Sequence, residues 1–171
     1  TFKSEMTNTI GSGYIAIKNV SPSSNPKNDN YIKRPFVIMR YAEILLNYVE
    51  ALNEYNPGNA DIETYLNKIR ERGGLGPVQS DLSQGQMREQ IRLERRIELC
   101  FEGHRFYDLR RWASNVAELN ETIRKPVITG SGTSFAEVEK RNYTSLYVPI
   151  PYSEMIRMKG LVQNEGWSNW E

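Results

Sequence analysis

Apolar residues recur at helical spacing in two pairs of segments. In the first pair, residues 36–55 are apolar nearly all round a helix, and their polar positions form one stripe at spacings of three and four. Such a helix is mostly buried. Residues 60–72 have a narrower apolar face, and Asn59 is placed to cap them. Because only the turn formers Asn56-Pro57-Gly58 separate the two segments, the pattern predicts an antiparallel helical hairpin over residues 35–74.

The second pair of helical segments follows a short loop. Ser83 and Gln86 have the spacing of a capping box, and helical spacing continues from there to Glu102. The glycine that follows is expected to break or kink this helix. Residues 105–113 are again amphipathic, and residues 115–123 extend the pattern as another short helix.

The rest of the chain is richer in turn formers. Residues 1–34 and 124–171 are predicted to be irregular, apart from short strands at Tyr14–Val20 and Tyr143–Val148. The predicted fold class is mainly α, with tetratricopeptide-like hairpins, irregular loops and a few short strands. Two hairpins, over residues 35–74 and 83–123, suggest part of a larger array, because about three such repeats are needed to bury a continuous core.

Composition narrows the function classes. The chain has 171 residues, of which 39% are hydrophobic and 25% charged, and its net charge is +1. These values are typical of a folded globular protein. Nucleic-acid binding is disfavoured, because it calls for a basic excess. No apolar run approaches the ~18 to 20 residues that cross a bilayer.

Two carboxylates fall on the apolar side of the third helix. Glu94 and Glu98 lie between apolar positions there, so both are expected to point inward and to need arginine partners. We therefore expect a structural ion network between the hairpins. Its expected members are Arg40, Glu43, Arg70, Glu94, Glu98 and Arg105. The alternative is a pair of carboxylates for acid/base catalysis.

Metal and cofactor chemistry find little support. His104 is the single histidine, which disfavours carboxylate–histidine metal sites and catalytic triads, so no metal site and no cofactor are expected. Gly73-Gly74-Leu75-Gly76 lacks the spacing and the lysine of a phosphate-binding loop. Cys100 lies on the apolar side of its helix, and we expect a buried, inert thiol.

Aromatic side chains are the remaining candidates for ligand binding. Flat rings stack on sugars while their polar tips form hydrogen bonds. Tyr48, Tyr107 and Trp112 occupy helical positions and are expected in the core. The candidate carbohydrate-binding residues are those in irregular segments, namely Tyr14, Tyr31, Trp167 and Trp170.

Several blocks of this sequence resemble the C-terminal region of the SusD/RagB family, in family order and at family spacing. The blocks are Arg40–Glu54, Leu66–Leu75, Glu94–Trp112, Val148–Glu154 and Gln163–Trp167. The resemblance extends over about residues 33–167, and residues 1–171 are interpreted as the C-terminal region of such a protein.

The resemblance implies a non-enzymatic nutrient receptor at the outer surface of an outer membrane. It implies capture of an oligosaccharide or polysaccharide, or of peptides in some members, for import by a partner TonB-dependent (SusC-like) porin. It also implies a lipid anchor on an N-terminal cysteine that is not present in this chain. The fold it implies is tetratricopeptide-like, and the present segment is mainly scaffold.

Two other functions stay open at this point. One is a free-standing helical-repeat module that binds other proteins. The other is a glycan-processing enzyme using Glu94 and Glu98, which requires both carboxylates to be accessible in a cleft and free of arginine partners.

Overall fold

A computed structural model describes residues 18–129 and 132–168. The described residues form two compact units, residues 18–105 and residues 106–168, which we call the hairpin unit and the ribbon unit. Most of their regular structure is helical, accompanied by a two-stranded sheet. The predicted mainly α fold class is confirmed.

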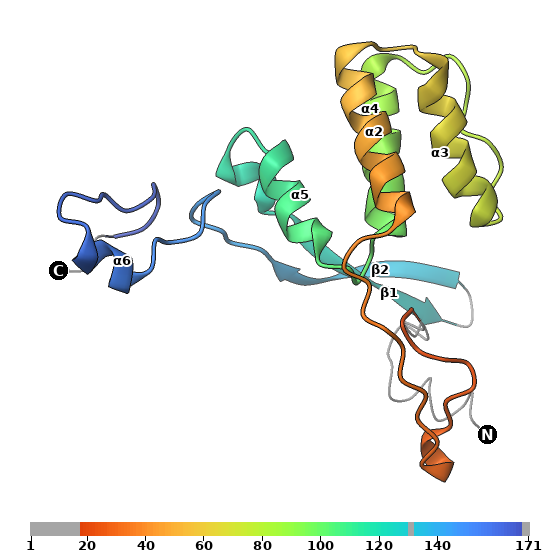
Figure 1. Cartoon of the computed structure of the whole chain (residues 1–171), viewed down its shortest axis with the longest axis horizontal. Coiled ribbons are helices and arrows are strands. Elements are labelled where there is room, and N and C mark those ends of the chain that lie inside the picture. The colour runs from red at the N-terminus through yellow and green to blue at the C-terminus, as the bar shows by residue number, and fades with distance from the viewer. Residues whose placement is uncertain (1–17, 130–131, 169–171) are drawn as a thin grey trace. The chain divides into compact units, whose positions relative to one another are not determined.

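Three helices build the hairpin unit after a short 3-10 turn, η1 (Pro26–Asn28). They are α2 (Tyr41–Tyr55), α3 (Ala60–Arg72) and α4 (Gln84–Glu98). α2 packs against both α3 and α4, as Figure 1 shows. The predicted helical hairpin, α2 followed by α3, is thus present, and α4 packs against both of its helices.

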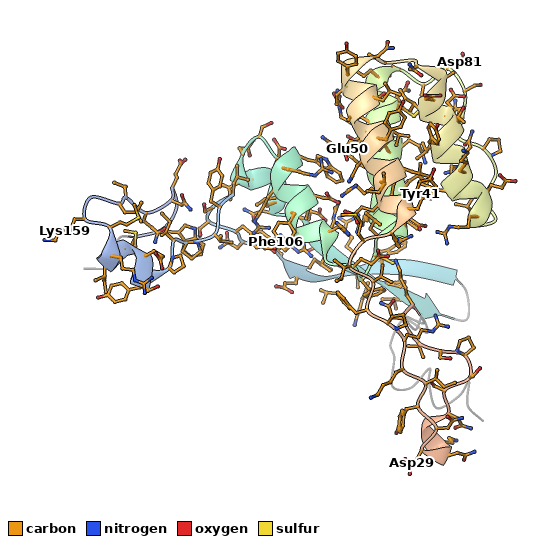
Figure 2. All side chains as sticks on the ribbon, viewed as in Figure 1. Asp29, Tyr41, Glu50, Asp81, Phe106 and Lys159 are labelled. Carbon is orange, nitrogen blue, oxygen red and sulfur yellow. The ribbon has the colours of Figure 1, made fainter. Side chains whose placement is uncertain are left out.

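A single apolar cluster holds these helices together, and Figure 2 shows side chains filling the space between them. Leu46 and Val49 of α2 are fully buried, as is Leu66 of α3. Burial of each such side chain stabilises the fold by about 1.5 to 3 kcal/mol. The buried members of the cluster are Leu45, Leu46, Val49, Ile62, Leu66, Ile69, Val78, Met87, Ile91 and Leu99.

The predicted helix starts of α3 and α4 are confirmed by side-chain caps. The Asn59 side chain accepts a hydrogen bond from the backbone N–H of Asp61 at 2.9 Å. Ser83 and Gln86 form the reciprocal capping box at the start of α4. These caps satisfy backbone donors that the helix itself leaves without partners.

Two predicted helix boundaries are wrong. α2 begins at Tyr41 and not at residue 36, because Phe36-Val37-Ile38 has low helix propensity and Arg40 is extended (φ −145°). α4 ends at Glu98 and not at residue 102, because Phe101 adopts a left-handed backbone with φ 63°. Leu99, the C-cap residue just before this turn, is buried in the core.

The ribbon unit contains shorter elements. Helix α5 (His104–Trp112), which starts two residues before the division, is followed by the 3-10 turn η2 (Val116–Leu119). Strands β1 (Thr122–Thr129) and β2 (Gly132–Lys140) form an antiparallel ribbon, and α6 (Tyr152–Arg157) lies beyond it. The ribbon contains a register shift after Ile123.

This ribbon corrects the prediction of a helix to residue 123 followed by an irregular segment. The signal in the sequence is the β-branched content of Thr122–Thr129. Pro126 within β1 weakened that signal, but a two-stranded ribbon has only edge strands, where proline is tolerated.

The strand predicted at Tyr143–Val148 is also wrong. This segment is irregular, because side chains and not a neighbouring strand bind its backbone carbonyl groups. Of the strand predicted at Tyr14–Val20, residues 14–17 lie outside the described residues, and Lys18 and Asn19 form a turn.

Three predictions of burial are corrected as well. Cys100 is exposed, because the chain leaves the helical path after Glu98. Tyr48 and Tyr107 are exposed, although both had been assigned to the core, and Trp112 is half-buried. Helical spacing identifies a face, but it does not say whether another element covers that face.

Candidate functional site

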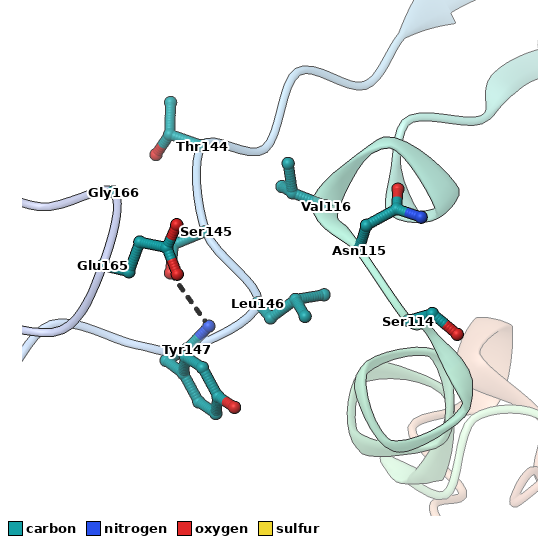
Figure 3. Close-up of a pocket in the computed structure, with 9 residues that line it drawn as sticks. All are labelled: Ser114, Asn115, Val116, Thr144, Ser145, Leu146, Tyr147, Glu165 and Gly166. Atoms are coloured by element: carbon teal, nitrogen blue, oxygen red, sulfur yellow. Dashed lines mark hydrogen bonds between the residues drawn. The ribbon is translucent and has the colours of Figure 1, made fainter.

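The ribbon unit contains a pocket of about 410 Å³, shown in Figure 3. One side is formed by the turn after α5, and the opposite side by the segments around residues 145 and 165. The lining residues are Ser114, Asn115, Val116, Thr144, Ser145, Leu146, Tyr147, Glu165 and Gly166. The lining combines apolar surface with hydroxyl and amide groups and the aromatic ring of Tyr147, which suits a ligand that has both apolar faces and hydrogen-bonding groups.

Local capping fixes the first side of the pocket. The Asn115 side chain accepts a hydrogen bond from the backbone N–H of Ala117 at 3.0 Å, which caps η2. Glu118 accepts a hydrogen bond from the Asn115 amide at 2.9 Å and one from the backbone N–H of Ser114 at 3.2 Å. Ser114 and Asn115 are therefore held in one conformation before any ligand arrives.

The opposite side begins at Tyr143. The backbone N–H of Tyr143 donates to the Asn120 side chain at 2.6 Å. This bond fixes the chain that leaves β2 next to the residue that precedes β1. Arg110 of α5 lies over the Tyr143 ring at 5.0 Å and over the Phe106 ring at 3.6 Å. Such cation–π contacts anchor the loop that follows.

Within that loop, Ser145 and Tyr147 have different roles. Ser145 is buried, and its Oγ accepts a hydrogen bond from the backbone N–H of Tyr147 at 3.0 Å, drawn as the dashed line in Figure 3. Tyr147 is 61% exposed and lines the pocket. It offers an accessible ring at the pocket rim.

Of the aromatic candidates that the structure describes, Trp167 is the one next to this pocket. It directly follows Glu165 and Gly166 in the chain, and its indole N–H donates to the Tyr147 carbonyl oxygen at 2.9 Å. Trp167 is 42% exposed. Tyr31 is 67% exposed and belongs to the hairpin unit, whereas Tyr14 and Trp170 lie outside the described residues.

Sequence reasoning missed Tyr147 and the polar residues around it. Tyr147 had been placed in a strand, and Asn115 in a continuing helix. The available signal was the Asn115-x-x-Glu118 spacing of a capping motif at the start of a new turn. No local signal pairs residues 114–116 with residues 144–147.

The charged side chains gather elsewhere, within the hairpin unit. Arg40 pairs with Glu98 and with Glu102, where its Nε lies 2.7 Å from the carboxylate. Glu98 also pairs with Arg72, and Glu102 also pairs with Lys18. These ion pairs connect the start of α2 and the end of α3 to the turn after α4.

A second ion pair lies deeper in the same unit. Glu94 is 4% exposed and pairs with Arg70, while the Gln90 amide donates to the same carboxylate at 2.8 Å. Arg70 also donates to the Gly76 carbonyl oxygen at 2.8 Å. The buried carboxylate thus has both a counter-charge and hydrogen bonds, as burial requires.

The other expected members of the network have different surroundings. Glu43 faces His104 of α5, with 3.6 Å between Glu43 Oε2 and His104 Nε2. Arg105 is half-buried in the first turn of α5. Glu102 and Lys18 belong to the Arg40 cluster although sequence reasoning did not include them, because the left-handed turn at Phe101 redirects the chain.

Electrostatics favour the charged forms in the Arg40 cluster. Burial opposes ionisation of Glu102, but hydrogen bonds from Arg40 and Lys18 outweigh it, so the pKa of this carboxyl lies below its ordinary value. The hydrogen bond to Glu102 also raises the pKa of Arg40, despite its partial burial. Both groups therefore stay ionised at neutral pH.

These contacts bear on the catalytic alternative. A general acid needs an accessible carboxyl whose proton is available near neutral pH. Glu98 borders a hollow of about 360 Å³, but it is paired with two arginines, and Glu94 is buried against a third. The geometry is that of charged acceptors in fixed ion pairs.

Residues 18–129 and 132–168 offer neither a metal site nor a membrane-spanning helix. Those residues contain no cluster of three or more histidine, cysteine or acidic side chains suited to a metal ion. None of the helices described is long and apolar enough to cross a bilayer.

Comparisons with known proteins place this chain in a family. The sequence profile of the SusD family matches residues 3–167. SusD-like protein P2 of Formosa agariphila is 34% identical over 136 residues, which are 75% of this chain and 25% of that protein. SusD-like protein P25 of the same organism is 37% identical over 103 residues, or 58% of this chain and 19% of that protein.

Solved structures agree with the sequence comparisons. The crystal structure of a SusD-like protein from Bacteroides fragilis is 33% identical, with a TM-score of 0.65, and the match covers 77% of this chain and 26% of that one. A SusD superfamily protein from Parabacteroides distasonis is 25% identical, with a TM-score of 0.52 and coverages of 77% and 27%. The chain spans about a quarter of the length of SusD-like protein P2 and of these two structures. With its helical hairpin, its ion pairs and its Gln163–Trp167 segment all inside the matched residues, the chain belongs to the SusD family.

Proposed function

We propose that this chain is the C-terminal, mainly scaffolding part of a SusD-type receptor that captures glycans without altering them. The observation that carries this proposal is the family match, which runs along residues 3–167. The hairpin unit supplies the scaffold, because the carboxylates of Glu94 and Glu98 are paired with arginines and its buried apolar side chains form a packed core. Capture itself takes place on irregular loops.

The pocket of the ribbon unit is the part of this segment best suited to contact a glycan. Sugars offer hydroxyl groups to polar side chains and C–H faces to aromatic rings. Ser114, Asn115 and Thr144 supply polar groups and Tyr147 supplies a ring, while the adjacent Trp167 donates a hydrogen bond to the Tyr147 carbonyl oxygen. These residues come from the two sides of one pocket.

The charge of the pocket selects among glycans. Among the described residues that line it, the one charged side chain is that of Glu165. A carboxylate accepts hydrogen bonds from sugar hydroxyls and repels uronic acids and sulfated sugars. The expected ligand is therefore a neutral glycan.

Location and partner follow from the same proposal. The receptor is held at the outer surface of the outer membrane by a lipid on an N-terminal cysteine outside this chain. It passes its glycan to a TonB-dependent porin. The near-neutral charge of this segment fits association with glycan and protein surfaces better than with nucleic acid.

Affinity electrophoresis tests glycan capture. The chain is run through gels containing amylopectin, laminarin, xylan or galactomannan, next to Tyr147→Ala and Trp167→Ala variants. We expect one of these neutral polysaccharides to retard the chain, and each variant to lose about tenfold in affinity. Tyr55→Ala, a change at an exposed ring of the hairpin unit, is the matched control.

The outcomes separate the alternatives. If Tyr147→Ala and Trp167→Ala were retarded as strongly as the parent chain, the pocket would not be the glycan-binding site. Failure of all four polysaccharides, with binding of a peptide panel instead, would point to the peptide ligands that the family resemblance also allows. Release of reducing ends during incubation would contradict the non-enzymatic function.

A further inference from the structure

The loop of residues 144–150 is bound by residues near the end of the described chain. Gln163, Asn164, Gly166 and Trp167 form a segment that we call the clasp. We propose that the clasp is the positioning device of the pocket: it holds the loop of residues 144–150 in the shape that presents Tyr147 to a ligand. The identity of the ligand rests on the proposed function, whereas the contacts between clasp and loop do not.

Gln163 forms the central contact of the clasp. Its side-chain amide donates to the Ile150 carbonyl oxygen at 3.0 Å, and its carbonyl oxygen accepts from the Ile150 backbone N–H at 2.6 Å. A glutamine amide has the same donor and acceptor as a peptide group, so it replaces a neighbouring strand at this residue. Gln163 is 7% exposed, and loss of its contacts would leave buried polar groups without partners.

Two more side chains extend this pairing along the loop. The Asn164 amide donates to the Val148 carbonyl oxygen at 2.8 Å, and the Trp167 indole donates to the Tyr147 carbonyl oxygen at 2.9 Å. The clasp therefore binds backbone groups of Tyr147, Val148 and Ile150. Prolines at positions 149 and 151 have no N–H to donate, so a regular strand ladder was not available here.

Gly166 lets the clasp close on the loop. Its φ of 87° lies in the left-handed region, and a Cβ atom placed on it would collide with the Thr144 carbonyl oxygen and lie 2.9 Å from Ser145 Cβ. No side chain fits at that separation. Gly166 also lines the pocket, so the closest approach between clasp and loop is part of the pocket wall.

The clasp acts on a ligand through the loop. Gln163, Asn164 and Trp167 do not line the pocket. They bind the loop whose residues Thr144 and Tyr147 do line it. They are therefore positioning residues. If the clasp opens, the loop keeps its own Ser145–Tyr147 hydrogen bond but loses the contacts that fix its place.

Gly166→Ala and Gly160→Ala form a matched pair that tests the clasp. Both glycines have positive φ, 87° and 90°, but a Cβ atom on Gly160 would have no neighbour within 4 Å. Alanine thus adds the same backbone strain at both positions and a collision only at Gly166. Hydrogen exchange of the full chain is measured at the backbone N–H groups of Tyr147 and Ile150, with Leu46 as an internal reference.

We expect Gly166→Ala to speed exchange of the Ile150 amide, which the clasp binds, about tenfold or more and to leave Leu46 unchanged. The Tyr147 amide, which is bonded to Ser145 Oγ within the loop, should change less. Gly160→Ala is expected to leave all three near the rates of the parent chain. Equal exchange at Ile150 in the two variants would overturn the clasp.

Ligand binding provides the second test. Gln163→Leu and Trp167→Phe are run in the amylopectin, laminarin, xylan and galactomannan gels. Trp167→Phe keeps a ring and removes one hydrogen bond, which covers the case in which Gln163→Leu disturbs the folding of the loop. We expect weaker retardation for both, about tenfold for Gln163→Leu, with the unfolding of the hairpin unit unchanged.

Retardation equal to that of the parent chain in both variants would overturn the positioning role. If no polysaccharide retards the parent chain, the proposed glycan capture fails, and the exchange rates of the glycine pair alone decide for or against the clasp.

Discussion

Glu94 shows how one residue depends on its partners. The carboxylate is nearly inaccessible, and Arg70 and Gln90 satisfy it from two helices. A buried ion pair adds little net stability compared with an apolar pair of similar volume, but removal of one partner leaves an uncompensated charge. The energetic role of this pair is therefore visible only when it is broken from one side.

Arg70→Met is expected to destabilise the hairpin unit by about 3 to 5 kcal/mol, because Glu94 stays buried without its counter-charge. Arg70→Met combined with Glu94→Met should recover most of that loss. Urea unfolding of both variants measures the difference. A double variant as unstable as the single one would show that the two side chains do not act as a pair.

Glu102 makes stability depend on pH. Its pKa lies below the ordinary value of 4.5, so its pairing with Arg40 and Lys18 stabilises the fold above that pH and is lost as the pH falls through the lowered pKa. Glu102→Gln should lower the unfolding temperature at pH 7. The difference from the parent chain should shrink between about pH 5 and pH 3. A difference that stays constant over this range would contradict the assignment.

At the scale of elements, α4 depends on its capping box. Ser83 and Gln86 satisfy one backbone N–H each, and the helix they start carries both Glu94 and Glu98. Ser83→Ala should cost about 1 kcal/mol, whereas Ser80→Ala, an exposed serine of the same loop, should change stability by less than about 0.5 kcal/mol. Thermal unfolding of both variants tests this. Equal losses would mean that the cap is not used.

Packing between helices is tested at Leu46 of α2. This side chain is fully buried among residues of all three helices, so Leu46→Ala should cost about 2 to 5 kcal/mol through lost contacts and the cavity left behind. Leu93→Ala on the exposed side of α4 is the matched control. Urea titrations compare the two, and similar midpoints would be inconsistent with the core described here.

At the scale of the whole molecule, α2 has an apolar face that the described residues leave largely exposed, apart from the contact of Tyr48 with Tyr65 of α3. Tyr41, Ile44, Tyr48 and Tyr55 follow one another at helical spacing on this face, and all are exposed. A helix that is apolar on both faces is normally buried on both. The unit therefore leaves part of its possible hydrophobic stabilisation unused.

The chain on its own should consequently be marginally stable. We expect a thermal unfolding midpoint below about 65 °C, the upper end of the usual mesophile range. Differential scanning calorimetry measures it. A cooperative transition well above that temperature would contradict the prediction.

The candidate site was harder to predict than the hairpins. Trp167 was identified because a tryptophan in an irregular segment is conspicuous, but its neighbours in the pocket were not. The bond from Tyr143 to Asn120 brings residues 144–147 back near residues 114–116, and the clasp joins residues 147–150 to residues 163–167. Bonds between a side chain and a distant backbone group leave no periodicity in the sequence, whereas the core of α2 and α3 does.

By itself, the sequence determined the helices of the hairpin unit, the caps of α3 and α4, the inward direction of Glu94 and the family blocks. Each of these depends on residues within one or two helical turns of one another. The tertiary structure decided where α2 begins, where α4 ends, which cations meet Glu98 and Glu102, and that Tyr143–Val148 is a pocket wall and not a strand. Those outcomes depend on which distant groups satisfy a charge or a backbone carbonyl, and only the folded chain brings such groups together.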